Sequence, residues 1–252
     1  MPNRLTLNRR NFSHGLAGLG TVALTGFVQG AQAAAPDGAG SIMNMSAMLQ
    51  ASKSLSFRTD TSFGASVAGD KLKTLGARAK VVFQRPDTLF AVFGEGGEED
   101  VQVLLSGGQA TLYRLSLASK AVLKLAPENG AAFSVPGFFI PFLGLLSDDV
   151  VKDLFGGIQS VTPIAEGSAS QPESTSLVAV MGSSFTGEVW TSVSNGLPTR
   201  VSGTWFSAKG DTAASAAVGF TDWSSEPPVE GAFAANGMVD QAKTVNIEAL
   251  GL

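Results

Sequence analysis

Residues 101–117 read VQVLLSGGQATLYRLSL, two alternating segments on either side of a glycine pair. Val101, Val103 and Leu105 recur at every second position, which is the period of a β-strand with one buried face. Gly107-Gly108 is typical of a two-residue hairpin turn. The stretch therefore predicts two antiparallel strands joined by a tight turn.

The same period-two pattern continues in both directions along the chain. Further strands are predicted at residues 55–61, 80–84, 89–93, 121–125, 158–164, 176–181, 188–193, 201–206 and 216–223. Asn195-Gly196 is a second hairpin signal. The connections are too short for the crossovers of a parallel sheet, so we expect a mainly β (α+β) chain with an antiparallel sheet.

Two segments break the strand pattern. Ser41 is a predicted N-cap of a helix that runs to about Lys53, with Ile42, Met45, Met48 and Leu49 on one face. Farther along, residues 136–146 are almost wholly apolar. Helices with an apolar face pack on a sheet, so periodicity alone predicts an antiparallel sheet with helices on one side.

A short helix is predicted directly after the apolar run. Ser147 is its expected N-cap, and Asp148 and Asp149 complement the positive end of the helix dipole. Gly156-Gly157 is expected to end it. We name residues 138–155, the apolar run with this helix, the lid segment.

The first 33 residues have the pattern of an export signal. Arg9-Arg10 and Phe12 precede an uncharged apolar run over 15–28, and Ala31-Gln32-Ala33 is a small-residue cleavage site. The arginine pair resembles a twin-arginine leader. We expect cleavage near Ala33, a disordered spacer over 34–40 and one domain over 41–252. The apolar run is too short to cross a bilayer, so we expect a periplasmic protein without a transmembrane segment.

Residue usage excludes several classes of function. The chain has no cysteine, and its one histidine, His14, lies in the leader. Zinc, haem and iron–sulfur centres depend on these side chains, as do the Ser-His-Asp and Cys-His catalytic groups. We therefore predict no metal, no cofactor and no catalytic residue. The net charge of −4 argues against nucleic acid as a partner.

Acidic and basic side chains leave a few alternatives open. Glu95, Glu98, Glu99 and Asp100 form either a solvated loop or a calcium site, although their spacing matches no calcium loop. Arg85, before Pro86, either ends a strand, bridges the sheet to the helices or meets an anionic headgroup.

The order of these motifs resembles a known family. Five features resemble the periplasmic lipoprotein carriers of the LolA and LolB type: a helix, a meander with Arg85-Pro86-Asp87, the hairpin at 106–109, the apolar insert, and the pair of Trp190 and residues 197–200 around a hairpin. Within that superfold, the chain is similar to the DUF2092 family of predicted periplasmic proteins. The resemblance implies a strongly curved, unclosed β-barrel, covered by an N-terminal helix and by the lid segment.

Aromatic and large apolar residues are the candidate ligand-binding residues of such a barrel. They are Phe57, Phe83, Phe90, Leu105, Tyr113, Phe138, Phe139, Phe142, Leu145, Trp190 and Trp205. Either they line a cavity for an acyl chain, or they fill a core. The first alternative predicts a non-enzymatic binding protein for a lipid, an acyl chain or a lipidated partner. The second predicts a structural or interaction protein that docks on another envelope protein. A carboxylate-based hydrolase is a third, for which no pair of acids stands out.

Overall fold

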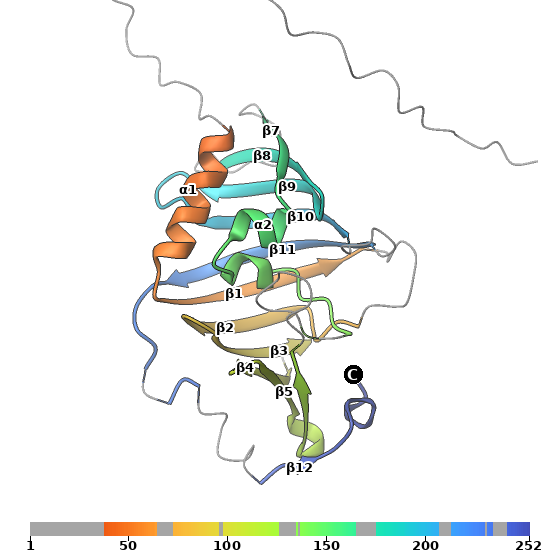
Figure 1. Ribbon diagram of the computed structural model, residues 1–252. Helices are drawn as coiled ribbons and strands as arrows, with labels where there is room; N and C mark the ends of the chain where they lie inside the picture. Colours follow the sequence, from red (N-terminus) through yellow and green to blue (C-terminus); the bar gives the residue numbers. More distant parts are fainter. Residues whose placement is uncertain are drawn as a thin grey trace, which may run out of the picture. The chain divides into compact units, whose positions relative to one another are not determined.

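The alternating segments form the strands of one sheet (Figure 1). The computed structural model describes residues 38–64, 73–95, 98–125, 135, 137–164, 175–206, 213–229, 231–233 and 241–252, all within one unit, Ala35–Leu252. The expected leader and residues 34–37 of the expected spacer lie outside the described residues, so both stay predictions.

In the described residues, twelve strands pair in the order β12-β6-β5-β4-β3-β2-β1-β11-β10-β9-β8-β7. Their bounds are β1 Ser54–Phe63, β2 Arg78–Gln84, β3 Thr88–Glu95, β4 Glu98–Ser106, β5 Gln109–Arg114, β6 Ser119–Lys124, β7 Ile158–Pro163, β8 Thr175–Gly182, β9 Phe185–Ser192, β10 Pro198–Phe206, β11 Ala213–Ser224 and β12 Lys243–Thr244. All pairs are antiparallel except β12 with β6. The sheet is unclosed, and the predicted mainly β, antiparallel class is confirmed.

The hairpin between β4 and β5 follows the predicted pattern. Ser106 pairs with Gln109 across the turn, and Val103 pairs with Leu112. Gly107 and Gly108 both have positive φ, 57° and 74°. Tight hairpin turns of this kind favour glycine because a β-carbon is strained in the left-handed region.

One pairing joins the two halves of the chain. β1 lies between β2 and β11, and Thr61 pairs with Val218. The partners are far apart in sequence, so no local pattern predicts which strand β1 meets. This pairing places β1, the first strand in the sequence, beside β11, one of the last, at the centre of the sheet.

α1 (Gly38–Ala51) begins three residues before the expected N-cap Ser41. Ile42, Met45 and Leu49 are buried as predicted, but Met48 is exposed. The expectation for Met48 is wrong because a residue six positions after Ile42 lies about 240° around the helix. α1 packs over β7 and β8 (Figure 1).

The lid segment is less helical than the resemblance implies. It contains a 3₁₀ turn, η2 (Leu143–Leu146), and only one α-helix, α2 (Val150–Phe155). Ser147 is not the N-cap, because its hydroxyl donates to the carbonyl of Gly144 at 2.9 Å. Asp149 caps α2 instead, accepting from the backbone N–H of Lys152 at 3.0 Å. Gly156 ends α2 with a φ of 69°, as predicted.

The C-terminal segment returns to the β6 end of the sheet, which the weak pattern of this region did not predict. After β12 comes a 3₁₀ turn, η3 (Ile247–Leu250), whose Leu250 side chain is buried in the core. Arg114 Nη1 donates to the carbonyl of Leu250 at 2.6 Å. Lys73 Nζ donates to the carbonyl of Leu252. None of the helices in the described ranges combines the length and apolar content of a membrane span.

Arg114 also pairs with Asp100, the last residue of the acidic stretch 95–100. Its Nε lies 2.7 Å from Asp100 Oδ2, and the backbone N–H of Ser116 donates to Asp100 Oδ1 at 2.8 Å. Burial acts to raise the pKa of Asp100, but the hydrogen bonds from Ser116 and Arg114, with the charge of Arg114, outweigh it and lower that pKa. The side chains of residues 95–99 lie outside the described residues, so the calcium alternative stays untested.

Asp100→Asn should lower the free energy of unfolding by about 1 kcal/mol at pH 7, because a charge-assisted pair is lost at a partly exposed position. A lowered carboxyl pKa stabilises the fold above the unfolded value of ~4, and that contribution is lost as the pH falls through the folded value. The difference from wild type should therefore shrink below about pH 4. Urea unfolding at pH 7, 5 and 3 measures it.

Asp60→Asn is the control, because the Asp60–Arg78 pair is exposed, with an N–O distance of 3.4 Å. It should change stability little at any of these pH values. A constant deficit for Asp100→Asn from pH 7 to pH 3 would contradict the electrostatic origin of the effect.

Candidate functional site

The lid segment covers the core face of the sheet with apolar side chains. The Phe142 ring lies 5.7 Å from the Phe57 ring and 6.2 Å from the Phe93 ring, measured between centroids. Phe142 is only 2% exposed, and Leu145 is fully buried. In this structure the lid's own side chains fill the space between the lid and this part of the sheet.

The other end of the lid segment meets a second aromatic group. The Phe139 ring lies 5.5 Å from Trp205 on β10 and 6.5 Å from Phe63 on β1. Phe139 is partly buried, and Phe63 is exposed at the end of its strand. The lid therefore runs from the exposed end of β1 to the fully buried core.

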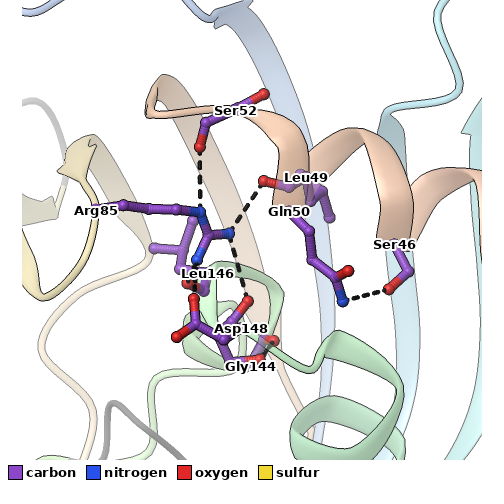
Figure 2. A network of polar contacts seen from close by, with 9 residues as sticks. Ser46, Leu49, Gln50, Ser52, Arg85, Gly144, Leu146 and Asp148 are labelled. Carbon is purple, nitrogen blue, oxygen red and sulfur yellow. Dashed lines mark hydrogen bonds and ion pairs between the residues drawn. The ribbon is translucent and has the colours of Figure 1, made fainter.

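Arg85 ties the lid segment to the sheet and to α1 (Figure 2). It follows β2, and its side chain is 16% exposed. The guanidinium donates to the carbonyl of Leu49 at 3.0 Å and to that of Ser52 at 3.1 Å, both at the C-terminal end of α1. Unpaired carbonyls at this end of a helix attract a cation.

On its other side the same guanidinium contacts the lid segment. Arg85 Nη1 lies 2.5 Å from Asp148 Oδ1 and 3.5 Å from the carbonyl of Leu146, and Nη2 lies 3.4 Å from the carbonyl of Ser147. The planar fork of arginine allows one side chain to serve acceptors on two elements. Of the alternatives that the sequence left open for Arg85, the structure shows two together: the residue lies directly after the end of β2, and it bridges the sheet to α1 and the lid.

The acids at the start of α2 have structural partners. Asp148 pairs with Arg85, and Asp149 caps the helix. Burial raises the pKa of Asp153, against a hydrogen bond from Ser147 and the charge of Lys152. These contacts account for the adjacent acids at 148 and 149 without a catalytic role.

A surface groove of about 390 Å³ lies between α1 and the start of α2. Its lining is mixed, with Met43, Ser46, Ala47, Gln50, Asp148, Asp149 and Val151. Gln50 Nε2 donates to Ser46 Oγ at 3.1 Å along its floor (Figure 2). The groove is open to solvent and is lined in part by the lid segment, unlike the apolar cavity that the resemblance implies.

Most of the predicted ligand-binding residues belong either to the lid segment or to the core face of the sheet. The members of the buried core are Phe57, Phe83, Leu105, Phe138, Phe142 and Leu145. Phe139 and Trp205 are partly buried and contact each other. Whether any of them binds a ligand stays a prediction.

Three predicted residues lie on the other face of the sheet. Phe90, Tyr113 and Trp190 each follow a core-facing neighbour on the same strand, respectively Leu89, Leu112 and Val189. Successive side chains of a strand point to opposite faces, so these three cannot contact the lid. The Trp190 ring lies instead beside Arg200, with 5.2 Å from the guanidinium carbon to the ring centroid.

Some core-face aromatics were missed. Phe185 lies 5.5 Å from Phe155 and 4.9 Å from Trp205, and Trp223 lies 4.3 Å from Phe57, between ring centroids. Alternation along β9 was the available signal for Phe185, since it shares a face with Val189. No signal identified the contact of Trp223 with Phe57, because it depends on the β1–β11 pairing.

Comparison with known proteins gave one sequence match and several structural ones. Residues 39–247 match the family described as "Predicted periplasmic protein (DUF2092)". No curated protein matches the chain.

Three solved structures illustrate the structural likeness. An uncharacterised conserved protein from Thermus thermophilus is 10% identical, with 82% of this chain and 96% of that chain covered and a TM-score of 0.45. The Mycobacterium tuberculosis lipoprotein LppX is 14% identical, with 75% and 96% covered and a TM-score of 0.45. A chain of the Pseudomonas aeruginosa MucA/MucB complex is 12% identical, with 79% and 60% covered and a TM-score of 0.40. All three scores are below 0.5, so these likenesses carry no functional inference.

Arg85→Ala should lower the free energy of unfolding by about 2–3 kcal/mol, because it leaves several partly buried carbonyl groups without a donor. Arg85→Lys should restore only part of this, since an ammonium cannot replace the planar fork. Arg58→Ala removes an exposed pair with Asp222 and should cost less than about 0.5 kcal/mol. Denaturant unfolding ranks the three variants, and equal losses for Arg85→Ala and Arg58→Ala would contradict the bridging role.

Proposed function

Since this chain belongs to the DUF2092 family of predicted periplasmic proteins, we propose that it works in the periplasm as a non-enzymatic binding protein for an acyl chain. The ligand, a lipid or the lipid group of a partner, lies between the core face of the sheet and the lid segment. The lid moves away from the sheet to admit it and then closes over it.

The apolar contacts between the lid and the sheet are the observation that supports this proposal. Phe139, Phe142 and Leu145 meet the sheet through apolar side chains alone, a kind of contact that an alkyl chain can replace without matching hydrogen bonds. The polar ties of the segment lie outside these apolar contacts. They include the Arg85 contacts at 146–148, the backbone bond from Phe139 N–H to the Lys73 carbonyl at 2.9 Å and that from Ser184 N–H to the Phe155 carbonyl at 3.1 Å.

Glycines at the two ends of the segment suit a moving lid. Gly137 has a φ of 82° and Gly157 a φ of 83°, and a β-carbon at either would meet nothing within 4 Å. Gly144 is different, because a β-carbon there would lie 2.9 Å from Leu154 Cα. Gly144 allows close packing within the lid, whereas Gly137 and Gly157 are the hinge candidates.

The energies are compatible with reversible binding. Burial of an acyl chain contributes about 0.8 kcal/mol per CH₂, so a chain of roughly sixteen carbons gains ~13 kcal/mol before the costs of association. Moving three large side chains such as Phe139, Phe142 and Leu145 from the sheet costs ~2–3 kcal/mol each. The free energy gained by burying the acyl chain exceeds the cost of moving these side chains by only a few kcal/mol. The contacts of Arg85 are therefore strong enough to influence whether the lid opens.

The second candidate is a structural or interaction protein with a filled core. The packing of Phe142 against Phe57 and Phe93 favours it, because the predicted cavity residues contact one another in this structure. The two candidates differ in what copurifies. If the lid opens to admit a ligand, lipid should copurify with the protein. If the core is permanent, no lipid should copurify.

Native mass spectrometry with lipid extraction, on the full chain expressed with its own leader and purified from the periplasm without detergent, separates the two candidates. We expect a defined mass adduct that extracts as lipid. A clean apo mass, together with no uptake of added fatty acid, would contradict the proposal and favour the interaction protein.

Phe139→Asp should reduce retention of an acyl ligand at least tenfold, because it places a charge where the lid meets Trp205. Phe139 is partly exposed, so the fold should survive, whereas an aspartate at buried Phe142 would destabilise the core. Val193→Asp, at a turn position that is 69% exposed, is the matched control and should retain the ligand. Equal retention in both variants would contradict a role for the lid.

A further inference from the structure

Trp205 has a polar atom that the closed structure leaves without a partner. Its side chain lies on the core face of β10, in ring contact with Phe139 of the lid and with Phe185 of β9. The indole Nε1 is buried and has no hydrogen-bond partner. A buried donor without an acceptor is destabilising, and such groups are few in native proteins.

The indole N–H of Trp223, in contrast, has a hydrogen-bond acceptor. Its Nε1 donates to the carbonyl of Pro198 at 2.8 Å. Both tryptophans pack against the core, so burial alone does not explain why one is satisfied and the other is not. The unpaired indole of Trp205 lies where its ring contacts Phe139 of the lid.

Trp205 lies midway along a continuous row of aromatic rings. The row runs from Phe63, which is 37% exposed, through Phe139 and Trp205 to the fully buried Phe185 and Phe155. A chain that enters at Phe63 would lie along apolar rings for its whole length and would pass one hydrogen-bond donor. The Phe139 ring contacts the ring that bears this donor, so a movement of the lid changes the surroundings of Trp205.

We propose that Trp205 Nε1 donates a hydrogen bond to the carbonyl oxygen that links the acyl chain to the rest of the ligand. The ligand class is then an acyl ester or amide, and not a bare hydrocarbon or an alkyl ether. This inference rests on the proposed function. An uncharged acceptor fits, because the indole carries no charge and its ring neighbours are aromatic, so a buried anion at this point would be costly.

The test compares two ligands that differ only in this carbonyl, 1-decanoylglycerol and 1-O-decylglycerol, by calorimetric titration of the full chain. Wild type should bind the ester about fivefold more tightly, the factor expected for one net hydrogen bond. Trp205→Phe keeps an aromatic ring but removes the donor, and it should bind the two ligands within about twofold of each other. Trp190→Phe is the control, because Trp190 lies on the other face of the sheet, and it should keep the preference for the ester.

The outcomes separate this inference from the function on which it rests. If wild type binds both ligands equally, or if Trp205→Phe still prefers the ester, the role of Trp205 is overturned and an acyl-binding function stands. If wild type binds neither, both are overturned. The wild-type comparison needs no variant, so it decides the question even if Trp205→Phe fails to fold.

Discussion

The guanidinium of Arg85 is the polar contact on which the placement of α1 and of the lid against the sheet depends. It lies at the end of β2 and bonds the last carbonyls of α1 on one side and residues 146–148 of the lid on the other. Neither α1 nor the lid is paired to the sheet by a ladder of backbone bonds. Their positions depend on apolar packing, which is not directional, and on this polar centre, which is.

This division supports the proposal that one surface serves both as a packed core and as a binding site. Apolar contacts between Phe142 and Phe57 or Phe93 are favourable in any similar arrangement, so an alkyl chain can substitute for them. The contacts of Arg85 fit one arrangement only. In the proposed mechanism, a lid built from the first kind of contact and fastened by the second kind closes either on itself or on a ligand, and Trp205 Nε1, unpaired in this structure, finds its acceptor only on the ligand.

Local pattern predicted the elements but not their partners. Period-two alternation is a property of a single strand, so the hairpin at Gly107-Gly108 was predictable, and the pairing of β1 with β11 was not. Alternation also shows which side chains of a strand share a face. The prediction that Phe90, Tyr113 and Trp190 belong to the site did not take this into account, and the three residues lie on the other face of the sheet. The lid was recognised by its apolar composition, but the N-cap of its short helix was not. Ser147 bonds the Gly144 carbonyl in the folded chain, so Asp149 caps the helix instead.

The sequence by itself determined the class of fold, the absence of histidine and cysteine from residues 34–252, and the apolar character of the lid, because these follow from residue type and spacing. Only the tertiary structure decided that Arg85 joins three elements, since its acceptors on α1 and the lid are brought to it by folding. The same holds for Trp205. Whether an indole N–H finds an acceptor depends on which strand and which part of the lid lie against it, and nothing local in the sequence specifies either.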